Sequence, residues 1–230
     1  MRIFLALLLC AIYSANPGAA AAQASRKGDA NLLPRYGAAP KSRALLKADA
    51  EFLAACDRDF PSRQAASSSY AQRGWAFFRV GDASTAIKRF NQAWLLDTTN
   101  AAAYWGFGAV AGLRKQYDAS LRDFRISLRL NPANTRVLLD IAQTHIVRYL
   151  NDNQTSDLDA AISNSLLFLA DSHDAQANTE AYLKLATASF YKQEYTGSWT
   201  YLDSATALNP DATRGWDLLP ELIRVSPRED

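Results

Sequence analysis

Residues 101–134 read AAAYWGFGAVAGLRKQYDASLRDFRISLRLNPAN, and residues 67–100, directly before them, read SSSYAQRGWAFFRVGDASTAIKRFNQAWLLDTTN. The two stretches carry large and small residues at the same offsets. Four residues of the first stretch recur 34 positions later in the second: Tyr70 and Tyr104, Gly74 and Gly108, Phe90 and Phe124, Leu96 and Leu130. Self-similarity at a fixed period is typical of repeat proteins, whose units stack on one another. The sequence therefore predicts a stacked array of similar units.

The same spacing continues outward to about residue 210. A small residue recurs in the first half of each unit: Gly74, Gly108, Ala142 and Ala186. Around it, aromatic and apolar residues form a stripe at helical spacing: Tyr70, Phe77, Tyr104, Phe107, Ile141, Tyr182 and Leu185. The second half pairs a small residue with a large one four positions on: Ala86 with Phe90, Ser120 with Phe124, Ser198 with Leu202. Pro132 and Pro210 mark helix ends, because proline disfavours helical backbone in the residue before it.

These residues resemble the spaced pattern of the tetratricopeptide-repeat (TPR) superfamily, with Trp or Tyr, Leu-Gly, Tyr, Ala, Phe and Pro at set positions. The resemblance covers roughly residues 67–210 and implies an all-α fold, a right-handed superhelical array of antiparallel helix pairs (a TPR solenoid) with capping helices at both ends. In such a pair the small residue lets the second helix approach the first closely. Thr98 in place of the closing Pro, and Arg73 in place of Leu, depart from the pattern.

The resemblance divides the array into four units, residues 67–100, 101–134, 135–178 and 179–210. Tyr104 and its counterpart Tyr182 lie 78 residues apart, so the third unit is ten residues longer than the period allows. We expect its helices at about 134–149 and 157–170, with the polar run 151–156 as a protruding loop. Asn153-Gln154-Thr155 in that run also has the form of a glycosylation sequon.

Segments outside the units are expected to cover the ends of the array, because the terminal units of a solenoid must hide their apolar faces. Residues 42–66 contain an amphipathic helix with Ser42 as N-cap and Leu45, Leu46, Ala50 and Leu53 apolar. Residues 211–230 form a C-terminal capping segment, interrupted by Pro220. Residues 25–41 are expected to be a flexible or wrapping leader.

The N-terminus has the features of a signal peptide, residues 1–24. Arg2 is followed by an apolar run, Ile3 to Tyr13, and then by small residues that permit cleavage near Ala24. The mature chain would then be periplasmic or secreted. A membrane anchor is the rival interpretation, but polar residues from Ser14 interrupt the run before the roughly 20 residues needed to span a bilayer. A lipoprotein attached through Cys10 is not expected, because Leu9 stands where that motif has a small residue. No later segment is apolar enough for stable membrane insertion.

No catalytic, metal or cofactor site is predicted. Cleavage would leave Cys56 as the single cysteine, either a buried small residue beside Phe52 and Leu53 or a reactive thiol. The two histidines, His145 and His173, have no carboxylate or cysteine at a metal-ligand spacing. The glycine-rich run 106–112 lacks the preceding strand that a phosphate-binding loop requires. The chain is therefore not expected to be an enzyme.

The charge is unevenly distributed along the repeats. Residues 67–134 carry nine Lys and Arg against four Asp and Glu, whereas residues 135–210 carry four against nine. Such a charge dipole can steer a charged partner, although a solvated helical surface can also acquire it by chance. A nucleic-acid partner is not expected, because binding would need a basic face over the whole domain.

The resemblance also implies a concave groove lined by the first helices of the units. Carried over position by position, it assigns to the groove Trp75, Phe78, Arg79, Trp105, Arg136, Leu139, Gln143, Phe190 and Tyr191. Core packing is the alternative interpretation for Trp75, Phe78 and Trp105. Ala71 and Trp75 stand where the family's carboxylate clamp has Lys and Asn, so an acidic C-terminal peptide is not the expected ligand of this groove.

The function implied is a non-catalytic protein–protein interaction module of the cell envelope, an adaptor, assembly factor or inhibitor. Its partner would be another protein or peptide of the envelope, bound through an apolar peptide or helix in the groove. Trp and Arg are the residue types enriched at binding hot spots, which favours this interpretation. The alternative is an accessory subunit or an enzyme with an unrecognised hydrolytic site.

Overall fold

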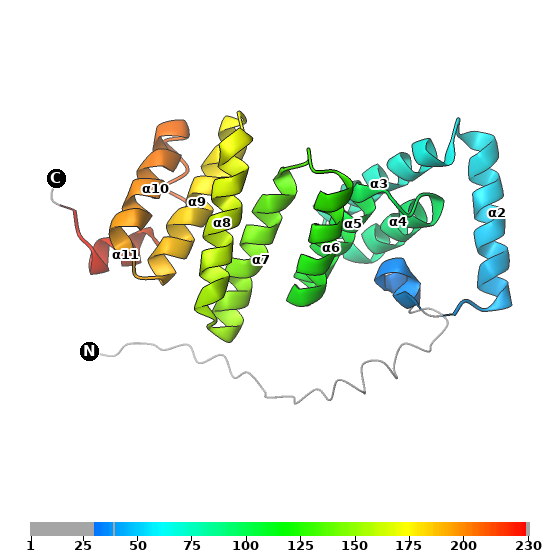
Figure 1. The fold of residues 1–230 in the computed structure, drawn as a ribbon, viewed down its shortest axis with the longest axis horizontal. Coiled ribbons are helices and arrows are strands. Elements are labelled where there is room, and N and C mark those ends of the chain that lie inside the picture. The colour runs from blue at the N-terminus through cyan, green and yellow to red at the C-terminus, as the bar shows by residue number, and fades with distance from the viewer. Residues whose placement is uncertain (1–29, 39, 229–230) are drawn as a thin grey trace.

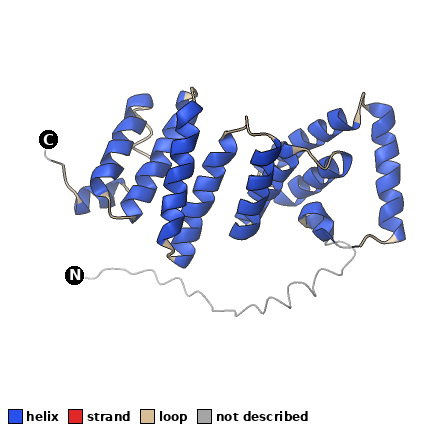
Figure 2. Ribbon diagram, viewed as in Figure 1, coloured by secondary structure: helices blue, strands red, loops and turns tan. Residues whose placement is uncertain are grey.

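The computed structural model describes residues 30–38 and 40–228. Within these residues every regular element is a helix, and no strand occurs (Figure 2). Two short 3-10 turns, η2 and η3, precede ten α-helices. The bounds are η2 Ala30–Leu32, η3 Pro34–Ala38, α2 Arg43–Asp59, α3 Arg63–Arg79, α4 Ala83–Leu96, α5 Ala101–Leu113, α6 Tyr117–Leu130, α7 Arg136–Asp152, α8 Thr155–Asp171, α9 Ala175–Tyr191, α10 Tyr195–Leu208 and α11 Leu219–Val225.

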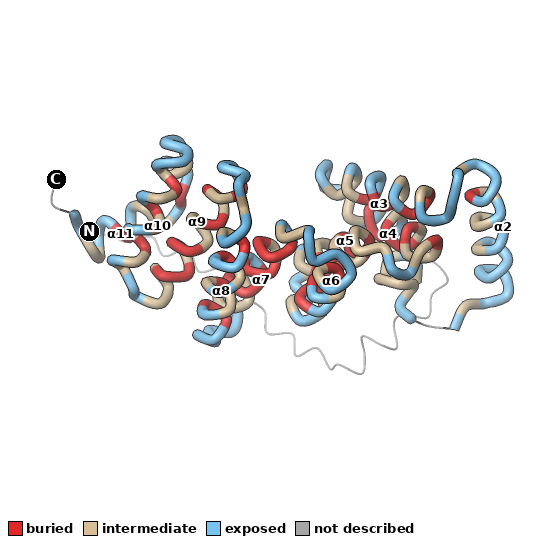
Figure 3. Tube along the Cα trace, turned by 45° about the horizontal axis from the view of Figure 1, so that its top comes forward, coloured by how far each residue is buried: buried red, intermediate tan, exposed pale blue. Residues whose placement is uncertain are grey.

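The helices pack consecutively into a helical-repeat array (Figure 1). The most extensive contacts lie within the pairs α3–α4, α5–α6, α7–α8 and α9–α10, and each pair then packs on the next. The first helices of neighbouring pairs also touch, though α5 and α7 do so over only a short stretch. The buried residues lie between successive helices along the array (Figure 3).

Each pair turns in the same way. One or two positions after the last residue of each first helix, a residue has a positive φ. These residues are Gly81 (83°), Lys115 (58°), Asn153 (55°) and Gln193 (64°). A left-handed residue at this place commonly ends an α-helix, and glycine or asparagine adopts it most readily. The four pairs therefore share a backbone device as well as a residue pattern.

The third pair differs from the expectation. Residues 151–156 do not form a protruding loop, because α7 continues to Asp152 and α8 begins at Thr155. Only Asn153 and Gln154 connect the two helices, and both are exposed. Part of the additional length lies in α8, which has 17 residues where α4, α6 and α10 have 14 each.

Glycine allows close packing of phenylalanine rings against the first helices. Phe90 of α4 is fully buried, and a Cβ built on Gly74 or on Gly106 would lie 2.5 Å or 2.3 Å from its ring. A Cβ on Gly108 would lie 2.4 Å from the ring of Phe124. These separations are far below van der Waals contact, so packing requires glycine at positions 74, 106 and 108.

The two ends of the array are covered unequally. Ser42 accepts a hydrogen bond from the Leu45 amide as N-cap of α2, as expected. However, the contacts of α2 with the other α-helices are few and lie mainly on α3, and the helix is exposed along most of its length (Figure 3). Leu45, Leu46 and Ala50, which were predicted to form part of the apolar face of this helix, are exposed. Cys56 is buried beside Ala66 and Leu96.

The C-terminal segment covers its end of the array more completely. Leu222 of α11 is fully buried, and it packs with Trp216 against Ala186 and Leu202. Pro220 lies in the first turn of α11. Proline is favoured there because its missing N–H would have no helical partner. Pro220 therefore begins this helix and does not interrupt it.

Residues 30–38 wrap across α4, α5 and α6. The Arg35 guanidinium donates to Asp123 of α6 at 2.7 Å, Arg114 donates to the Leu32 carbonyl at 2.7 Å, and Asn91 donates to the carbonyls of Asn31 and Leu33. Burial of Asp123 raises its pKa, an effect that the Arg35 hydrogen bond opposes. Of the two forms expected for the leader, these residues take the wrapping one. The expected signal peptide, 1–24, with Cys10, lies outside the described residues.

Candidate functional site

The aromatic residues expected to line the groove meet at the junction of α3 and α5. The ring centroids of Trp75 and Trp105 are 4.6 Å apart, and Trp75 also makes edge contacts with Phe78 and Phe90. Both indoles are half-buried. One side of each belongs to the core, since Trp75 packs on the cluster around Phe90 and Trp105 on the cluster around Phe124. The pair is thus partly core and partly surface.

The two indole N–H groups have different surroundings. Trp105 Nε1 donates to Asp140 Oδ2 of α7 at 2.6 Å, which ties α5 to α7. Burial raises the pKa of the Asp140 carboxyl above its ordinary value, and the hydrogen bond from Trp105 only partly opposes this effect. Trp75 Nε1 is buried and has no hydrogen-bond partner among the described residues. A buried donor without an acceptor costs about 1–3 kcal/mol.

The other predicted groove residues do not continue this surface. Leu139 is 1% exposed and packs in the core with Phe168 and Ala177, so its assignment to the groove is wrong. Its side of α7 faces α8 and α9. Phe190 contacts Trp216 of the C-terminal segment, and Tyr191 contacts Tyr149 of α7. These two aromatics form a separate group at the far end of the array.

The polar members of the predicted groove are exposed. Arg136 reaches Glu180 of α9 at 3.4 Å, and Gln143 accepts from Lys184, also of α9, at 3.1 Å. Both therefore bridge α7 to α9. Arg79 is exposed at the end of α3, close in sequence to Phe78. Trp75, Phe78, Arg79 and Trp105 remain as one candidate surface, here called the aromatic face.

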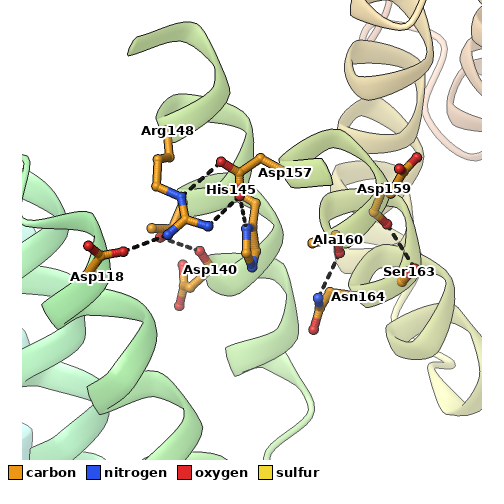
Figure 4. Close-up of polar contacts among 10 residues, drawn as sticks. Asp118, Asp140, His145, Arg148, Asp157, Asp159, Ala160, Ser163 and Asn164 are labelled. Carbon is orange, nitrogen blue, oxygen red and sulfur yellow. Dashed lines mark hydrogen bonds and ion pairs between the residues drawn. The ribbon is translucent and has the colours of Figure 1, made fainter. Parts of the chain in front are cut away.

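A second polar site joins α6, α7 and α8 (Figure 4). His145 Nδ1 lies 2.6 Å from Asp157 Oδ1, and the Arg148 guanidinium donates to both oxygens of Asp157, at 2.9 and 2.5 Å. Arg148 also donates to Asp118 of α6 at 2.6 Å. His145 therefore has a carboxylate partner that the spacing of residues in the sequence did not indicate. The partner lies twelve residues on, across the turn at Asn153.

The network is almost entirely buried at Asp157 and His145, which are 1% and 5% exposed. Burial lowers the pKa of His145 against the opposing effect of its hydrogen bond to Asp157. Burial alone would raise the pKa of Asp157, but hydrogen bonds from Arg148 and His145 outweigh it, and the net pKa is lowered. Asp157 is thus ionised at neutral pH and accepts the proton-bearing Nδ1–H of a neutral His145.

A histidine oriented by a carboxylate is also half of a nucleophilic catalytic arrangement. Among the described residues, however, Asp157 is the hydrogen-bond partner of the His145 ring. Cys56 lies in α2, at the opposite end of the first two helix pairs (Figure 1). The arrangement supports a clamp between helices, in which Asp157 satisfies two buried donors.

Two adjacent recesses open beside Arg148, with volumes of about 480 and 500 Å³. They share Asp118, Arg122 and Arg148. The first continues toward the α5–α6 turn at Lys115 and the second along α6. The second is lined by Asp118, Leu121, Arg122, Arg125, Ile126, Arg129 and Arg148. The excess of basic residues in 67–134 was apparent from the sequence, but the gathering of arginines at this recess was not.

No family model matches the chain, and no curated protein matches its sequence. In the described residues, no group of three or more His, Cys, Asp or Glu side chains is placed to hold a metal ion. None of the helices that the structure describes is long and apolar enough to cross a membrane. The functional interpretation therefore depends on the two sites themselves.

Proposed function

We propose that the chain is an exported TPR-like solenoid that acts as a non-catalytic protein–protein interaction module of the cell envelope. The 34-residue period, the consecutive packing of helix pairs and the left-handed residue after each first helix support the TPR-like assignment. Stacked helix pairs create extended surfaces that serve binding more than chemistry. The partner is an apolar peptide or helix of another envelope protein.

The observation that carries the proposal is the Trp75–Trp105 pair on the aromatic face. Two large rings, tilted by 55° with centroids 4.6 Å apart, are only half-buried, and the buried indole N–H of Trp75 has no acceptor among the described residues. Tryptophan and arginine dominate binding hot spots because they bury a large, rigid area. A bound segment would pack on the exposed sides of the two rings, and Arg79 would lie at the rim.

The aromatic face is tested with a partner captured stoichiometrically from periplasmic extract and then purified. Trp105→Ala should weaken its affinity by about 2 kcal/mol or more, as hot-spot truncations do. Trp75→Phe shortens the ring that faces Trp105, so it should weaken binding. It also removes a buried donor that has no acceptor, which offsets part of the lost packing and should keep the melting temperature close to that of the wild type. Affinity is measured by calorimetry and stability by thermal unfolding on the same samples.

Trp199→Phe is the matched control, because Trp199 Nε1 bonds the Ser226 carbonyl at the other end of the array. It should not affect partner affinity. If Trp75→Phe and Trp105→Ala both bind as tightly as the wild type, the aromatic face is not the binding surface. If Trp105→Ala unfolds the protein, the pair is core and the proposal loses its main support.

Export is tested separately. The protein recovered from its native host should begin near Ser25, after cleavage at Ala24, because the small residues before that position suit a signal peptidase. N-terminal sequencing of the extracellular or periplasmic fraction measures this directly. A chain that retains Met1 and stays in the cytoplasm would contradict the envelope location.

A further inference from the structure

The second recess, between α6 and α7, is strongly basic. We call it the arginine recess and define it by Arg122, Arg125 and Arg129 of α6 and Arg148 of α7, with Leu121 and Ile126 between them. Asp118 is its single acidic residue. Its volume is about 500 Å³, which can hold several side chains of a bound segment.

Three of the four guanidiniums form no ion pair with a carboxylate among residues 30–38 and 40–228. In the described part of the chain, the ion pairs at this recess are those of Arg148 with Asp118 and Asp157. Arg122, Arg125 and Arg129 are exposed and stand at i, i+3 and i+7 on one face of α6. Like charges at helical spacing destabilise a helix by a few tenths of a kcal/mol per pair. The row is therefore unfavourable for the isolated fold, and an anionic ligand would relieve it.

Arg148 gives the row a fixed end. Its side chain is 24% exposed, and Asp157, itself held by His145, orients the guanidinium (Figure 4). Its bond to Asp118 is weakly held, since the Asp118 side chain is 86% exposed. A stronger carboxylate ligand can displace Asp118 without disturbing the buried Asp157 contact.

We propose that the arginine recess is a second binding surface, whose occupant is an acidic helical segment of a partner protein. The three arginines span about 10 Å along α6, which matches two turns of a facing helix. Arginine recognises carboxylates through paired hydrogen bonds. Ile126, which is partly exposed, adds an apolar contact between the charges, whereas Leu121 is buried beneath them. The surface lies on α6 and α7 and stands independently of the aromatic face.

Other anions fit the recess less well. A single phosphate would engage one or two guanidiniums, not a row about 10 Å long. A flat anionic membrane would reach the exposed arginines but not Arg148, which lies inside the recess. Residues 1–29 of the chain contain one acidic residue, Asp29, so the N-terminal segment does not supply a matching row of carboxylates.

The probe is a fluorescein-labelled, alanine-based helical peptide of about 15 residues, with Glu at i, i+4 and i+7 and Leu between them. This is the spacing of the arginines read antiparallel. A second peptide carries Gln in place of Glu. Fluorescence anisotropy with the mature chain should show binding of the Glu peptide that weakens steeply with salt, and weaker binding of the Gln peptide.

Arg125→Glu should weaken binding of the Glu peptide by about tenfold or more, and Arg125→Gln by less. Arg58→Glu, on the exposed face of α2, is the matched control and should bind as the wild type does. Arg125 is exposed, so circular dichroism should show both variants folded. Tight binding of phosphatidylglycerol vesicles without binding of the peptide would overturn the proposal in favour of a membrane. Equal binding of the two peptides, or self-association of the chain that Arg125→Glu abolishes, would also overturn it.

Discussion

Gly106→Ala is expected to destabilise the protein by about 1–3 kcal/mol, the usual cost of overpacking a core. In an ordinary helix the same change stabilises by about 1 kcal/mol, because alanine has the higher helix propensity. Here the new Cβ would lie 2.3 Å from Phe90 Cζ, and the same ring atoms already pack closely against Gly74. The ring is rigid and fully buried, so it cannot turn aside without moving α4 relative to α3 and α5.

Gly112→Ala is the matched control, because it makes the same substitution in the same helix. A Cβ at Gly112 meets only Ser120 Oγ, at 3.4 Å, an ordinary contact. This variant should therefore match or exceed the wild type in stability. Chemical denaturation with urea measures both, and Gly108→Leu should behave like Gly106→Ala, or worse, because of Phe124.

A double mutant separates steric conflict from any other effect of the substitution. Phe90→Leu removes the ring and is itself destabilising, since it empties part of a buried site. Added to Gly106→Ala, it should restore part of the lost stability, so the two changes will not be additive. Simple additivity, or a Gly106→Ala protein as stable as Gly112→Ala, would show that the backbones do not approach as closely as described.

The glycine positions were predictable from sequence because they repeat. Gly74 and Gly108 recur with Phe90 and Phe124 at the same offsets, and close packing is the physical reason for such a pairing. Gly106 lies outside the repeated pattern, and only the structure shows that it faces Phe90 from the neighbouring pair. A periodic pattern reports contacts within a unit more readily than contacts between units.

The third pair shows where sequence reasoning fails. A polar run at 151–156 is typical of a loop, but residue propensities are a weak guide to helix ends. Asn153 ends α7 in the left-handed conformation, and α8 begins only two residues later. Leu139 was also misassigned. Leu139 packs against Phe168 of α8 and Ala177 of α9, so a groove position carried over from the family falls in the core.

Neither the His145–Asp157–Arg148 network nor the arginine recess could be predicted from the spacing of residues in the sequence. Asp157 reaches His145 only because a two-residue turn folds α8 back along α7. The excess of basic residues in 67–134, by contrast, is visible in the sequence. Its concentration at one recess depends on how α6 faces α7, and in particular on Arg148, which belongs to the acidic half of the chain.

Asp157→Asn should destabilise the protein by about 3 kcal/mol at neutral pH. Removing one partner of a buried ion pair typically costs about 3–5 kcal/mol, because the remaining charge is left without compensation. The lower end applies here, since Arg148 keeps some contact with water and with Asp118. Asp159→Asn is the matched control, two residues away on the same helix. Asp159 pairs with Lys192 at the surface, where such bridges contribute about 0–1 kcal/mol.

The pH dependence of stability gives this prediction its sharpest test. The pKa of Asp157 is lowered in the folded protein, so its ionised form stabilises the fold above the unfolded pKa of about 4, and that contribution is lost as the pH falls through the folded value. The pKa of His145 is lowered too, so the unfolded chain takes up a proton first and stability also falls as the pH drops below about 6.5. The wild type should therefore unfold more easily on acidification, and Asp157→Asn should lose the part of that dependence below pH of about 4. Urea denaturation between neutral and acidic pH measures both slopes. If Asp157→Asn matches Asp159→Asn at neutral pH and keeps the wild-type acid dependence, the buried clamp between α7 and α8 contributes no stability.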